Sequence, residues 1–376
     1  MKTSILCFDV SDNAIGRAWL LARLLEPLGS VEIVGPCFGA GVWEPVAQET
    51  VPVRSVRGGR FPAFAARLPE LMRLAAGDLV YASKPRLPSA GVGYLERVAR
   101  RRPLLLDIDD WETGFFLRGG FWGTVGRTLN LSNPRSLTWT WLMERLTWLA
   151  DGVTVASRFL QERWGGVLLP HVRDTDRWAP ERIDPRPARE WLRLNGEHVV
   201  MFLGTPRAYK GVDDLAAAMS RLGRPNVALA LVGTDPASAT GRALAERYPG
   251  VRLVGRVPIA QVPSYLAAAD VVVVPQRESR DTRGQVPAKL FDAMALGRPL
   301  VSTRVSMIPE ILEGCGLVVE PGDVAALSSA IERLLDHPDE ARALGAEARR
   351  RCVQRYSFDA ARRALFPLVE RALARR

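Results

Sequence analysis

Residues 199–219 read VVMFLGTPRAYKGVDDLAAAM. The first five are apolar, a pattern typical of a parallel strand whose sheet is covered on both faces. A short loop with Gly204, Arg207 and Lys210 follows and leads into an amphipathic helical pattern. A strand that passes through a short loop into a helix is the repeating unit of α/β proteins. The stretch therefore predicts a parallel sheet flanked by helices.

The same alternation extends through the chain in both directions. The expected strands are Ser4–Val10, Val31–Gly35, Leu79–Ser83, Leu104–Ile108, Gly152–Val155 and Val167–Leu169, then Val199–Leu203, Val227–Val232, Val251–Val254, Val271–Val274 and Leu300–Ser302. The expected helices include Gly16–Leu28, Ser89–Arg101, Leu137–Ala150, Gly211–Leu222, Pro287–Leu296, Asp323–Leu335, Pro338–Arg355 and Phe358–Ala374. We therefore expect two Rossmann-like, doubly wound α/β halves that face each other across a cleft.

The length of 376 residues suits two domains, each large enough to bury a core. The segment Thr175–Asn195 is rich in Pro, Arg and Glu and lacks a periodic apolar pattern, so it is the expected linker. We accordingly predict an N-terminal domain over residues 1–178 and a C-terminal domain over 179–356. Residues 357–376 form a final helix that can pack back across the linker.

Composition narrows the class of partner. The 51 Lys and Arg exceed the 41 Asp and Glu, and the net charge of +10 favours anionic partners such as nucleotide phosphates, nucleic acids or acidic lipids. The four cysteines form no C-x-x-C pair, which indicates reduced thiols and argues against a zinc knuckle. No apolar run has the length of a membrane span, and the N-terminus lacks a secretion signal. We expect a cytoplasmic protein whose contact with a membrane is at most peripheral.

The loop after the first quoted strand has the chemistry of a diphosphate site. Gly204 allows close approach of the backbone, and Arg207 and Lys210 supply positive charge beside a helix N-terminus. An ordinary strand–helix turn with solvated basic residues would read the same way. A second stretch, GQVPAKLFDAMALGRPLV at residues 284–301, places helix amides and the carboxylate of Asp292 at the carboxyl edge of the sheet. Ligands of open α/β sheets bind there, and a carboxylate can accept hydrogen bonds from ribose.

These two loops, together with Pro309-Glu310 and the segment GLVVEPGD at residues 316–323, resemble the retaining glycosyltransferases of family 4, which have the GT-B fold. The resemblance covers nearly the whole C-terminal half. It extends back to Ser157 and to LPHVRD at residues 169–174, which is similar to the family's PNGVD segment. It implies a UDP- or GDP-linked sugar as donor, a glycan or lipid-linked acceptor, and no further cofactor.

By this resemblance, Lys210 binds the donor diphosphate and Asp292 stands where the family's second glutamate contacts ribose. The family's arginine after the first glycine is replaced by Thr205, so Arg207 is the candidate to supply that charge. The other residues that we predict at the donor are Gly204, Gln285, Val286 and Lys289.

The family's first glutamate is also missing, because its position is occupied by Gly284. Glu278 and Asp281, upstream in the same loop, are the alternatives for its contact with the sugar. The departures at Thr205 and Gly284 also leave open a nucleotide-binding protein whose transferase site has decayed. A nucleotide-sugar 2-epimerase of the same architecture is another alternative, although it would need histidines near the sugar and the chain has only 3.

The acceptor side is predicted at two strand ends of the first half. Asp109 and Asp110 follow the strand Leu104–Ile108, and buried carboxylates are costly unless they are paired or functional. Asp109 stands at the position of the family's histidine, so it would orient or deprotonate the acceptor hydroxyl. Lys210 and Arg207 would stabilise the departing diphosphate.

The end of the first strand contributes the remaining acceptor-side residues. These are Asp9, Asn13, Gly16 and Arg17, although a plain helix start would give the same pattern. The Asp107-x-Asp109 spacing matches a metal-binding motif of a different glycosyltransferase fold. The two-Rossmann layout makes that match accidental, and we expect no essential metal ion.

Two segments suggest where an acceptor in a membrane would be met. Arginines and apolar residues are mixed over residues 54–73, where Pro69 should interrupt any continuous helix. Trp139, Trp141 and Trp148 form a second cluster, which buried core tryptophans would also explain. A nucleic-acid partner is not expected, because no known nucleic-acid-binding module is visible.

Overall fold

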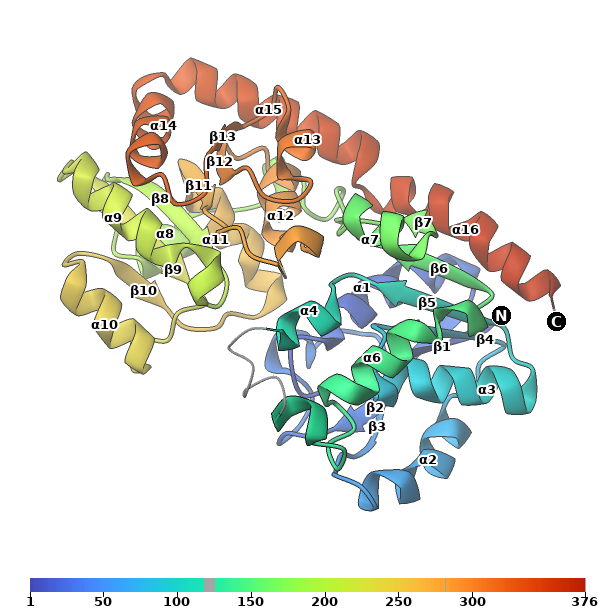
Figure 1. Ribbon diagram of the computed structural model, residues 1–376. Helices are drawn as coiled ribbons and strands as arrows, with labels where there is room; N and C mark the ends of the chain where they lie inside the picture. Colours follow the sequence, from blue (N-terminus) through green and yellow to red (C-terminus); the bar gives the residue numbers. More distant parts are fainter. Residues whose placement is uncertain (118–125, 281, 376) are drawn as a thin grey trace. The chain divides into compact units, whose positions relative to one another are not determined.

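The computed structural model describes residues 1–117, 126–280 and 282–375. The chain forms two compact units (Figure 1). The first combines residues 1–170 with residues 361–376, and the second spans residues 171–360. The first unit is therefore built from both ends of the chain.

The described part of the first unit contains a seven-stranded parallel sheet in the order β3-β2-β1-β4-β5-β6-β7. The strands are β1 (Lys2–Cys7), β2 (Ser30–Cys37), β3 (Val53–Arg57), β4 (Leu79–Ser83), β5 (Leu104–Ile108), β6 (Gly152–Val155) and β7 (Val167–Leu168). The strand order reverses between β1 and β4. This topological switch point is where doubly wound sheets bind ligands.

Helices cover both faces of this sheet (Figure 1). They are α1 (Ile15–Leu25), α2 (Ala63–Leu74), α3 (Val92–Arg100), α4 (Glu112–Phe116), α6 (Leu137–Arg145), α7 (Arg158–Trp164) and α16 (Phe358–Ala374). Helices α2, α3, α6 and α7 share one core cluster with the sheet, and α1 packs against β1 and β2.

The expectation that Pro69 would break the helix is wrong, because α2 continues through it. An interior proline costs a helix about 3 kcal/mol. Helix α2 buries Phe64 and Leu71 almost completely in the core, and each such burial contributes about 1.5–3 kcal/mol. Packing against the sheet therefore outweighs the missing backbone hydrogen bond.

The described part of the second unit contains a six-stranded parallel sheet in the order β10-β9-β8-β11-β12-β13. The strands are β8 (His198–Leu203), β9 (Val227–Val232), β10 (Arg252–Val254), β11 (Val271–Val274), β12 (Leu300–Thr303) and β13 (Leu317–Val319). The helices are α8 (Arg186–Trp191), α9 (Val212–Leu222), α10 (Ala239–Arg247), α11 (Val262–Ala268), α12 (Ala288–Ala295), α13 (Ile308–Leu312), α14 (Val324–Asp336) and α15 (Pro338–Arg355). Here the switch point lies between β8 and β11. The predicted class, doubly wound parallel α/β in two Rossmann-like halves, is confirmed.

The chain passes from the first unit to the second between Pro170 and His171. The segment that the sequence suggested as a linker lies inside the second unit. Its helix α8 packs against α11, and Arg189 donates a hydrogen bond of 3.1 Å to the carbonyl oxygen of Ala268. A segment without apolar periodicity is thus fixed by polar contacts, which the pattern does not reveal.

Two other sequence predictions concern the state of the cysteines and the presence of membrane-spanning segments. All four cysteines are free thiols. Within residues 1–117, 126–280 and 282–375, the helices are too short or too polar to pass through a lipid bilayer.

Candidate functional site

The loops that follow β8 and β11 lie against each other at the switch point of the second sheet. Gly211 adopts a left-handed conformation with φ of 66°, and a Cβ atom on it would lie 1.8 Å from the carbonyl oxygen of Pro275. Arg277 donates a backbone hydrogen bond of 2.9 Å to Tyr209. Only glycine fits at residue 211, so the close approach of the two loops depends on it.

Basic side chains join the two predicted donor loops. Lys210 donates a hydrogen bond of 3.0 Å from Nζ to Oε1 of Gln285. Lys289, in the first turn of α12, reaches back to β8, where its Nζ lies 4.6 Å from the ring centre of Phe202. A Cβ atom on Gly204 would lie 2.4 Å from the same Nζ. The structure therefore brings together Gly204, Lys210, Gln285 and Lys289.

Lys289 is a poorly compensated cation. Burial lowers its pKa to about 8, while the nearby carboxylate of Asp292 acts in the opposite direction and Arg207 lowers it further. Within the described residues no carboxylate forms an ion pair with Lys289. A partly buried cation without an ion-pair partner favours the binding of an anion at this edge of the sheet.

Asp292 is buried on α12 and has an arginine partner that the sequence did not reveal. Its Oδ1 atom accepts a hydrogen bond from Nε of Arg173, in the segment just after the passage between the units. Arg173 also donates to the carbonyl oxygen of Ala288, at 3.3 Å. Among the described residues, Oδ2 of Asp292 has no hydrogen-bond donor. Arg173 therefore fixes the carboxylate and leaves one oxygen available.

Two further polar side chains near the carboxyl ends of strands are buried without hydrogen bonds among the described residues. They are the amide of Gln276, two residues beyond β11, and the hydroxyl of Thr234, two residues beyond β9. Buried polar groups are almost always paired, because an unpaired group costs about 1–3 kcal/mol. The sequence analysis did not single out either residue.

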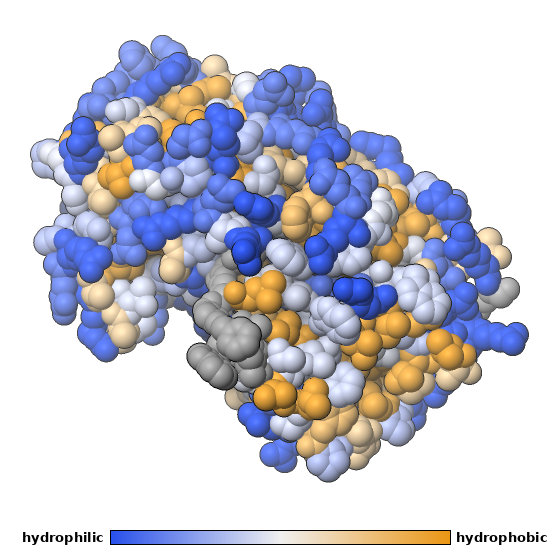
Figure 2. Space-filling model, viewed as in Figure 1, coloured by the Kyte–Doolittle hydropathy of each residue, from blue (hydrophilic) through white to orange (hydrophobic). Residues whose placement is uncertain are grey.

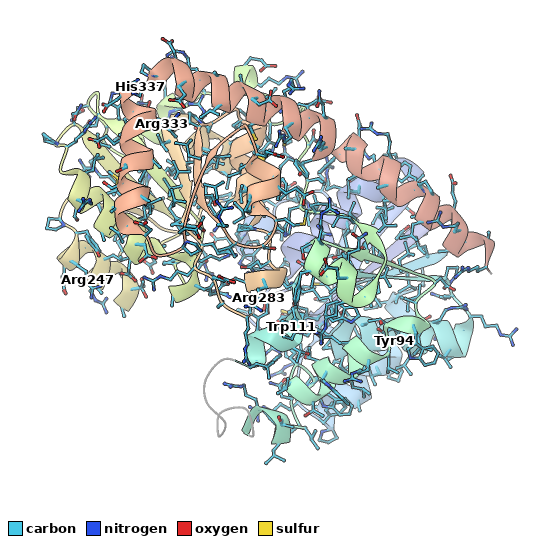
Figure 3. The ribbon with its side chains drawn as sticks, turned by 45° about the horizontal axis from the view of Figure 1, so that its top comes forward. Tyr94, Trp111, Arg247, Arg283, Arg333 and His337 are labelled. Atoms are coloured by element: carbon cyan, nitrogen blue, oxygen red, sulfur yellow. The ribbon has the colours of Figure 1, made fainter. Side chains whose placement is uncertain are left out.

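The alternatives for the missing first glutamate are not resolved. Glu278 is exposed and lies 3.6 Å from Arg283, which is also exposed and is labelled in Figure 3. Asp281 lies outside the described residues. Thr205 is exposed, whereas Gly284 and Val286 are buried in the loop before α12. The roles of all five in donor binding stay predictions.

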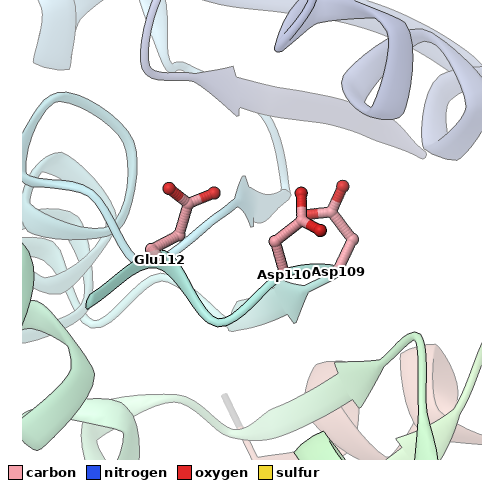
Figure 4. A group of neighbouring side chains, drawn as sticks. All are labelled: Asp109, Asp110 and Glu112. Carbon is pink, nitrogen blue, oxygen red and sulfur yellow. The ribbon is translucent and has the colours of Figure 1, made fainter. Parts of the chain in front are cut away.

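At the carboxyl edge of the first sheet, the carboxylates of Asp109, Asp110 and Glu112 lie close together (Figure 4). Nζ of Lys84, the residue after β4, lies 2.7 Å from Oδ1 of Asp109. It lies 2.8 Å from Oδ2 of Asp110 and 2.9 Å from Oε1 of Glu112. Arg86 forms a further ion pair with Glu112. We call Lys84, Asp109, Asp110 and Glu112 the Lys84 cluster.

Asp109 has the electrostatics of a general base. Burial raises the pKa of its carboxyl group to about 7, although the Lys84 ammonium favours the charged form. Asp110 and Asp107 add to the increase. A base is most effective when its pKa lies near the working pH. Among the described residues, neither carboxylate oxygen of Asp109 receives a hydrogen bond, and the contact of Oδ1 with Lys84 is an ion pair.

Arg17 and Asp107 form a buried ion pair beside this cluster. Nε and Nη2 of Arg17 donate to the two oxygens of Asp107 at 2.9 and 2.8 Å. Nη2 also donates a hydrogen bond to the carbonyl oxygen of Leu169. The hydroxyl of Thr154 donates a hydrogen bond to Asp107. These contacts give Arg17 a structural role. Its predicted contact with an acceptor stays a prediction.

The other predicted acceptor-side residues follow β1. Asp9 is buried, accepts a hydrogen bond of 2.9 Å from the backbone of Ser11, and forms an ion pair of 2.5 Å with Arg135. Asn13 is exposed, and its carbonyl oxygen accepts a hydrogen bond of 3.2 Å from the backbone of Gly16. Asp9 thus holds its own loop, which lies at the same switch point as the Lys84 cluster.

The sequence analysis missed Lys84, Arg86 and Glu112. One signal could have found Lys84: it directly follows the predicted strand Leu79–Ser83, at the sheet edge to which Asp109 was assigned. Neighbouring parallel strands end at the same edge, and Ser83 pairs in register with Asp107. Of the three histidines, His198 begins β8 and His337 lies between α14 and α15 (Figure 3).

Removal of divalent metal ions should leave the activity of the protein unchanged. Asp109, Asp110 and Glu112 are grouped closely enough to attract a cation, but the ammonium of Lys84 already lies between them. We expect kcat to stay within about twofold after dialysis against EDTA, measured with and without added Mg²⁺ or Mn²⁺. A strong loss that Mn²⁺ restores would contradict this assignment of the cluster.

Comparison with known proteins finds that the segment containing the two predicted donor loops matches a family model. Residues 197–337 match the model of Glycosyl transferases group 1. This range includes Gly204, Lys210, Gln285, Lys289 and Asp292.

The most similar relatives include a mannosyltransferase. The GDP-mannose-dependent alpha-(1-6)-phosphatidylinositol monomannoside mannosyltransferase of Mycolicibacterium smegmatis is 33% identical over 218 residues, which are 53% of this chain and 57% of that protein. The alpha-D-kanosaminyltransferase of Streptomyces kanamyceticus is 28% identical over 46% of this chain and 45% of its own length. The chain thus spans about half the length of the curated relatives it matches.

Solved structures resemble the whole chain. Sucrose-phosphate synthase from Thermosynechococcus elongatus has a TM-score of 0.74 at 21% identity, covering 100% of this chain and 99% of that one. Anabaena HepE in complex with UDP-glucose has a TM-score of 0.76 at 18% identity, covering 98% and 99%. At these identities the likeness concerns the fold alone. The GT-B fold expected from the sequence is confirmed.

Proposed function

We propose that the protein is a glycosyltransferase that moves a sugar from a nucleoside-diphosphate sugar to an acceptor hydroxyl with retention of anomeric configuration. One observation carries the proposal. At the switch point of the second sheet, Lys210 and Lys289 join two loops that both lie within the segment matching the group 1 model. Cations at such an edge suit a diphosphate.

The donor would be held at both ends of its nucleoside diphosphate. Lys210, Lys289 and Arg207 supply positive charge for the phosphates, and the first amides of α12 add hydrogen-bond donors. Oδ2 of Asp292 would accept a hydrogen bond from a ribose hydroxyl, while Oδ1 accepts the hydrogen bond from Arg173. A donor that also bonds to the amide of Gln276 would remove the cost of burying it unpaired.

The reaction needs no protein nucleophile in this proposal. The acceptor oxygen bonds to the anomeric carbon on the face from which the diphosphate departs, and the bond from that carbon to the diphosphate oxygen breaks. Asp109 accepts the proton of the acceptor hydroxyl. Lys210 and Arg207 stabilise the charge that develops on the diphosphate.

The surface of the first unit favours a lipid-linked acceptor at the cytoplasmic face of a membrane. Apolar residues gather over α6 and its neighbours in Figure 2, and Leu129, Trp141 and Trp148 are 72, 47 and 74% exposed. The arginines at positions 60, 67, 73 and 145 are exposed as well. Exposed tryptophans with basic residues are typical of docking on anionic lipids. The relative from Mycolicibacterium smegmatis is named for a phosphatidylinositol-based acceptor.

Thermal unfolding with a panel of nucleotide sugars tests the proposal. At 100 times its Kd, a bound donor stabilises the protein by about 2.7 kcal/mol. For a unit of this size, that should raise Tm by roughly 5–10 °C. We expect GDP-mannose, UDP-glucose or another member of the panel to give this shift. The product's anomeric configuration, determined by NMR, tests retention.

Lys210→Gln should weaken binding of that nucleotide sugar by roughly 10- to 150-fold, because a hydrogen bond to a charged group contributes about 1.5–3 kcal/mol. Isothermal titration calorimetry measures the change. Arg247→Gln is the matched control, since it removes a positive charge from an exposed side chain on α10 (Figure 3). If no member of the panel binds, the proposal fails. Binding without transfer to any acceptor would favour the decayed site.

A further inference from the structure

Lys84 has an unusual backbone conformation that is held from several directions. Its φ of 70° lies in the left-handed region, which residues with a side chain rarely adopt. Its backbone nitrogen donates a hydrogen bond of 2.9 Å to the carbonyl oxygen of Asp107, the strand residue two positions before Asp109. Its carbonyl oxygen accepts hydrogen bonds of 2.8 Å from Ser89 Oγ and from the backbone of Arg86. Strain of this kind persists only where the surroundings fix it, and it gathers at functional sites.

The ammonium group of Lys84 is surrounded by the carboxylates of the cluster. It donates hydrogen bonds to Asp110 and Glu112 at 2.8 and 2.9 Å. It meets Oδ1 of Asp109 as an ion pair at 2.7 Å. Lys84 is 8% exposed, so these interactions are little screened by water. Arg86 holds the other oxygen of Glu112, at 2.8 Å from Nε. The surrounding carboxylates, one of which is itself fixed by Arg86, therefore determine the position of the ammonium.

We propose that Lys84 is a positioning residue for the transfer, which holds Asp109 through Oδ1, presents Oδ2 to the acceptor hydroxyl and keeps the negative charge on that carboxylate. This inference rests on the proposed function and adds to it the group that controls its base. Lys84 itself does not touch the acceptor. It acts through Asp109 alone.

Other charged groups around Asp109 set the direction of the effect. Asp110 on the same loop and Asp107 on β5 favour its protonated form, whereas Arg17 on α1 favours the charged form. Glu112, at the start of α4, contacts Lys84 and is itself held by Arg86. On the loop after β1, burial raises the pKa of the Asp12 carboxyl group, and the positive charge of Lys84 acts in the opposite direction. Removing the lysine leaves mainly acidic neighbours, so the pKa of Asp109 must rise.

A direct titration tests the inference without relying on activity. Protein labelled with ¹³C at aspartate carboxyl carbons is titrated by NMR, and Asp109→Asn identifies the signal of Asp109. Lys84→Gln should raise the midpoint of that signal by about 1–3 pH units, the usual effect of losing an opposite charge at this distance. Asp110→Asn should lower the midpoint, because it removes a like charge. Lys2→Gln, a partly exposed lysine paired with Glu32 at the start of β1, is the control and should leave the midpoint in place.

Kinetics supply the second measurement, with the donor and acceptor that the panel identifies. The acidic limb of kcat/KM should move to higher pH in Lys84→Gln by the same amount as the midpoint, and Lys84→Arg should bring it back. A structural role alone would lower kcat without moving the limb. An unmoved midpoint in folded Lys84→Gln overturns the inference. If that variant does not fold, an unmoved midpoint in Asp110→Asn overturns it. A wild-type protein that transfers no sugar contradicts the proposed function instead.

Discussion

Replacing Asp109 with asparagine should lower kcat by about 10²- to 10⁴-fold, the usual contribution of a general base. The amide has nearly the same shape and keeps an oxygen that can face Lys84, but it cannot accept the acceptor's proton. The Kd of the nucleotide sugar should stay within about twofold, because the change alters none of the residues proposed to bind the donor. Steady-state kinetics and calorimetry separate the two effects.

The pKa of Asp109 determines in which direction kcat/KM should change with pH. Burial raises the pKa of Asp109 to about 7, so below that pH the group holds a proton and cannot act as a base. In the wild-type protein kcat/KM should fall about tenfold per pH unit below pH 7 and level off above it. The Asp109→Asn variant should lack this limb, while Glu26→Gln on the surface of the same unit should retain it. A variant with unchanged kcat would mean that the leaving diphosphate takes the proton.

Replacing Arg17 with methionine should destabilise the first unit by about 3–5 kcal/mol, because it leaves the carboxylate of Asp107 buried without its charge partner. Both side chains are almost fully buried, and the hydroxyl of Thr154 would remain as a donor to Asp107. Methionine fills a similar volume, so the loss reflects charge and hydrogen bonds more than a cavity. Urea unfolding followed by tryptophan fluorescence measures the change.

Two variants make the stability experiment decisive. Arg23→Met, on the same helix, removes a surface pair with Glu26 and should cost no more than about 1 kcal/mol. The double variant Arg17→Met/Asp107→Leu should be more stable than Arg17→Met, because it removes the stranded charge together with its partner. If Arg17→Met unfolds like Arg23→Met, the buried pair does not stabilise the unit.

The fold could be predicted where burial leaves a continuous apolar run. Leu79–Ser83, Leu104–Ile108 and Val271–Val274 were predicted with the bounds that the structure has, because central parallel strands are apolar on both faces. The edge strands β3 and β13 were not predicted. In β3 the residues Arg54, Ser55 and Arg57 are exposed, so this strand lacks the continuous apolar run on which the prediction relies.

The candidate site could be predicted only as far as each loop carries its own chemistry. The two loops predicted to bind the donor could be singled out because their glycines, lysines and carboxylate lie close together in sequence. The partners of the key carboxylates come from further away. Arg173 and Asp292 are separated by 119 positions, and Lys84 meets Asp109 because β4 and β5 are neighbours in the sheet. Such contacts depend on sheet order and register, which no local pattern contains.

Helix α16 packs in the first unit with residues 1–170, although it follows the second unit in the sequence. Leu365, Leu368 and Ala372 of α16 are buried there, and the side chain of Leu368 lies against Gly152 of β6. During synthesis on the ribosome the second unit is complete before this helix emerges, so it can fold first although its residues are made later. Until then residues 1–170 would expose the apolar surface that α16 covers, and we expect chaperones to bind this half during translation.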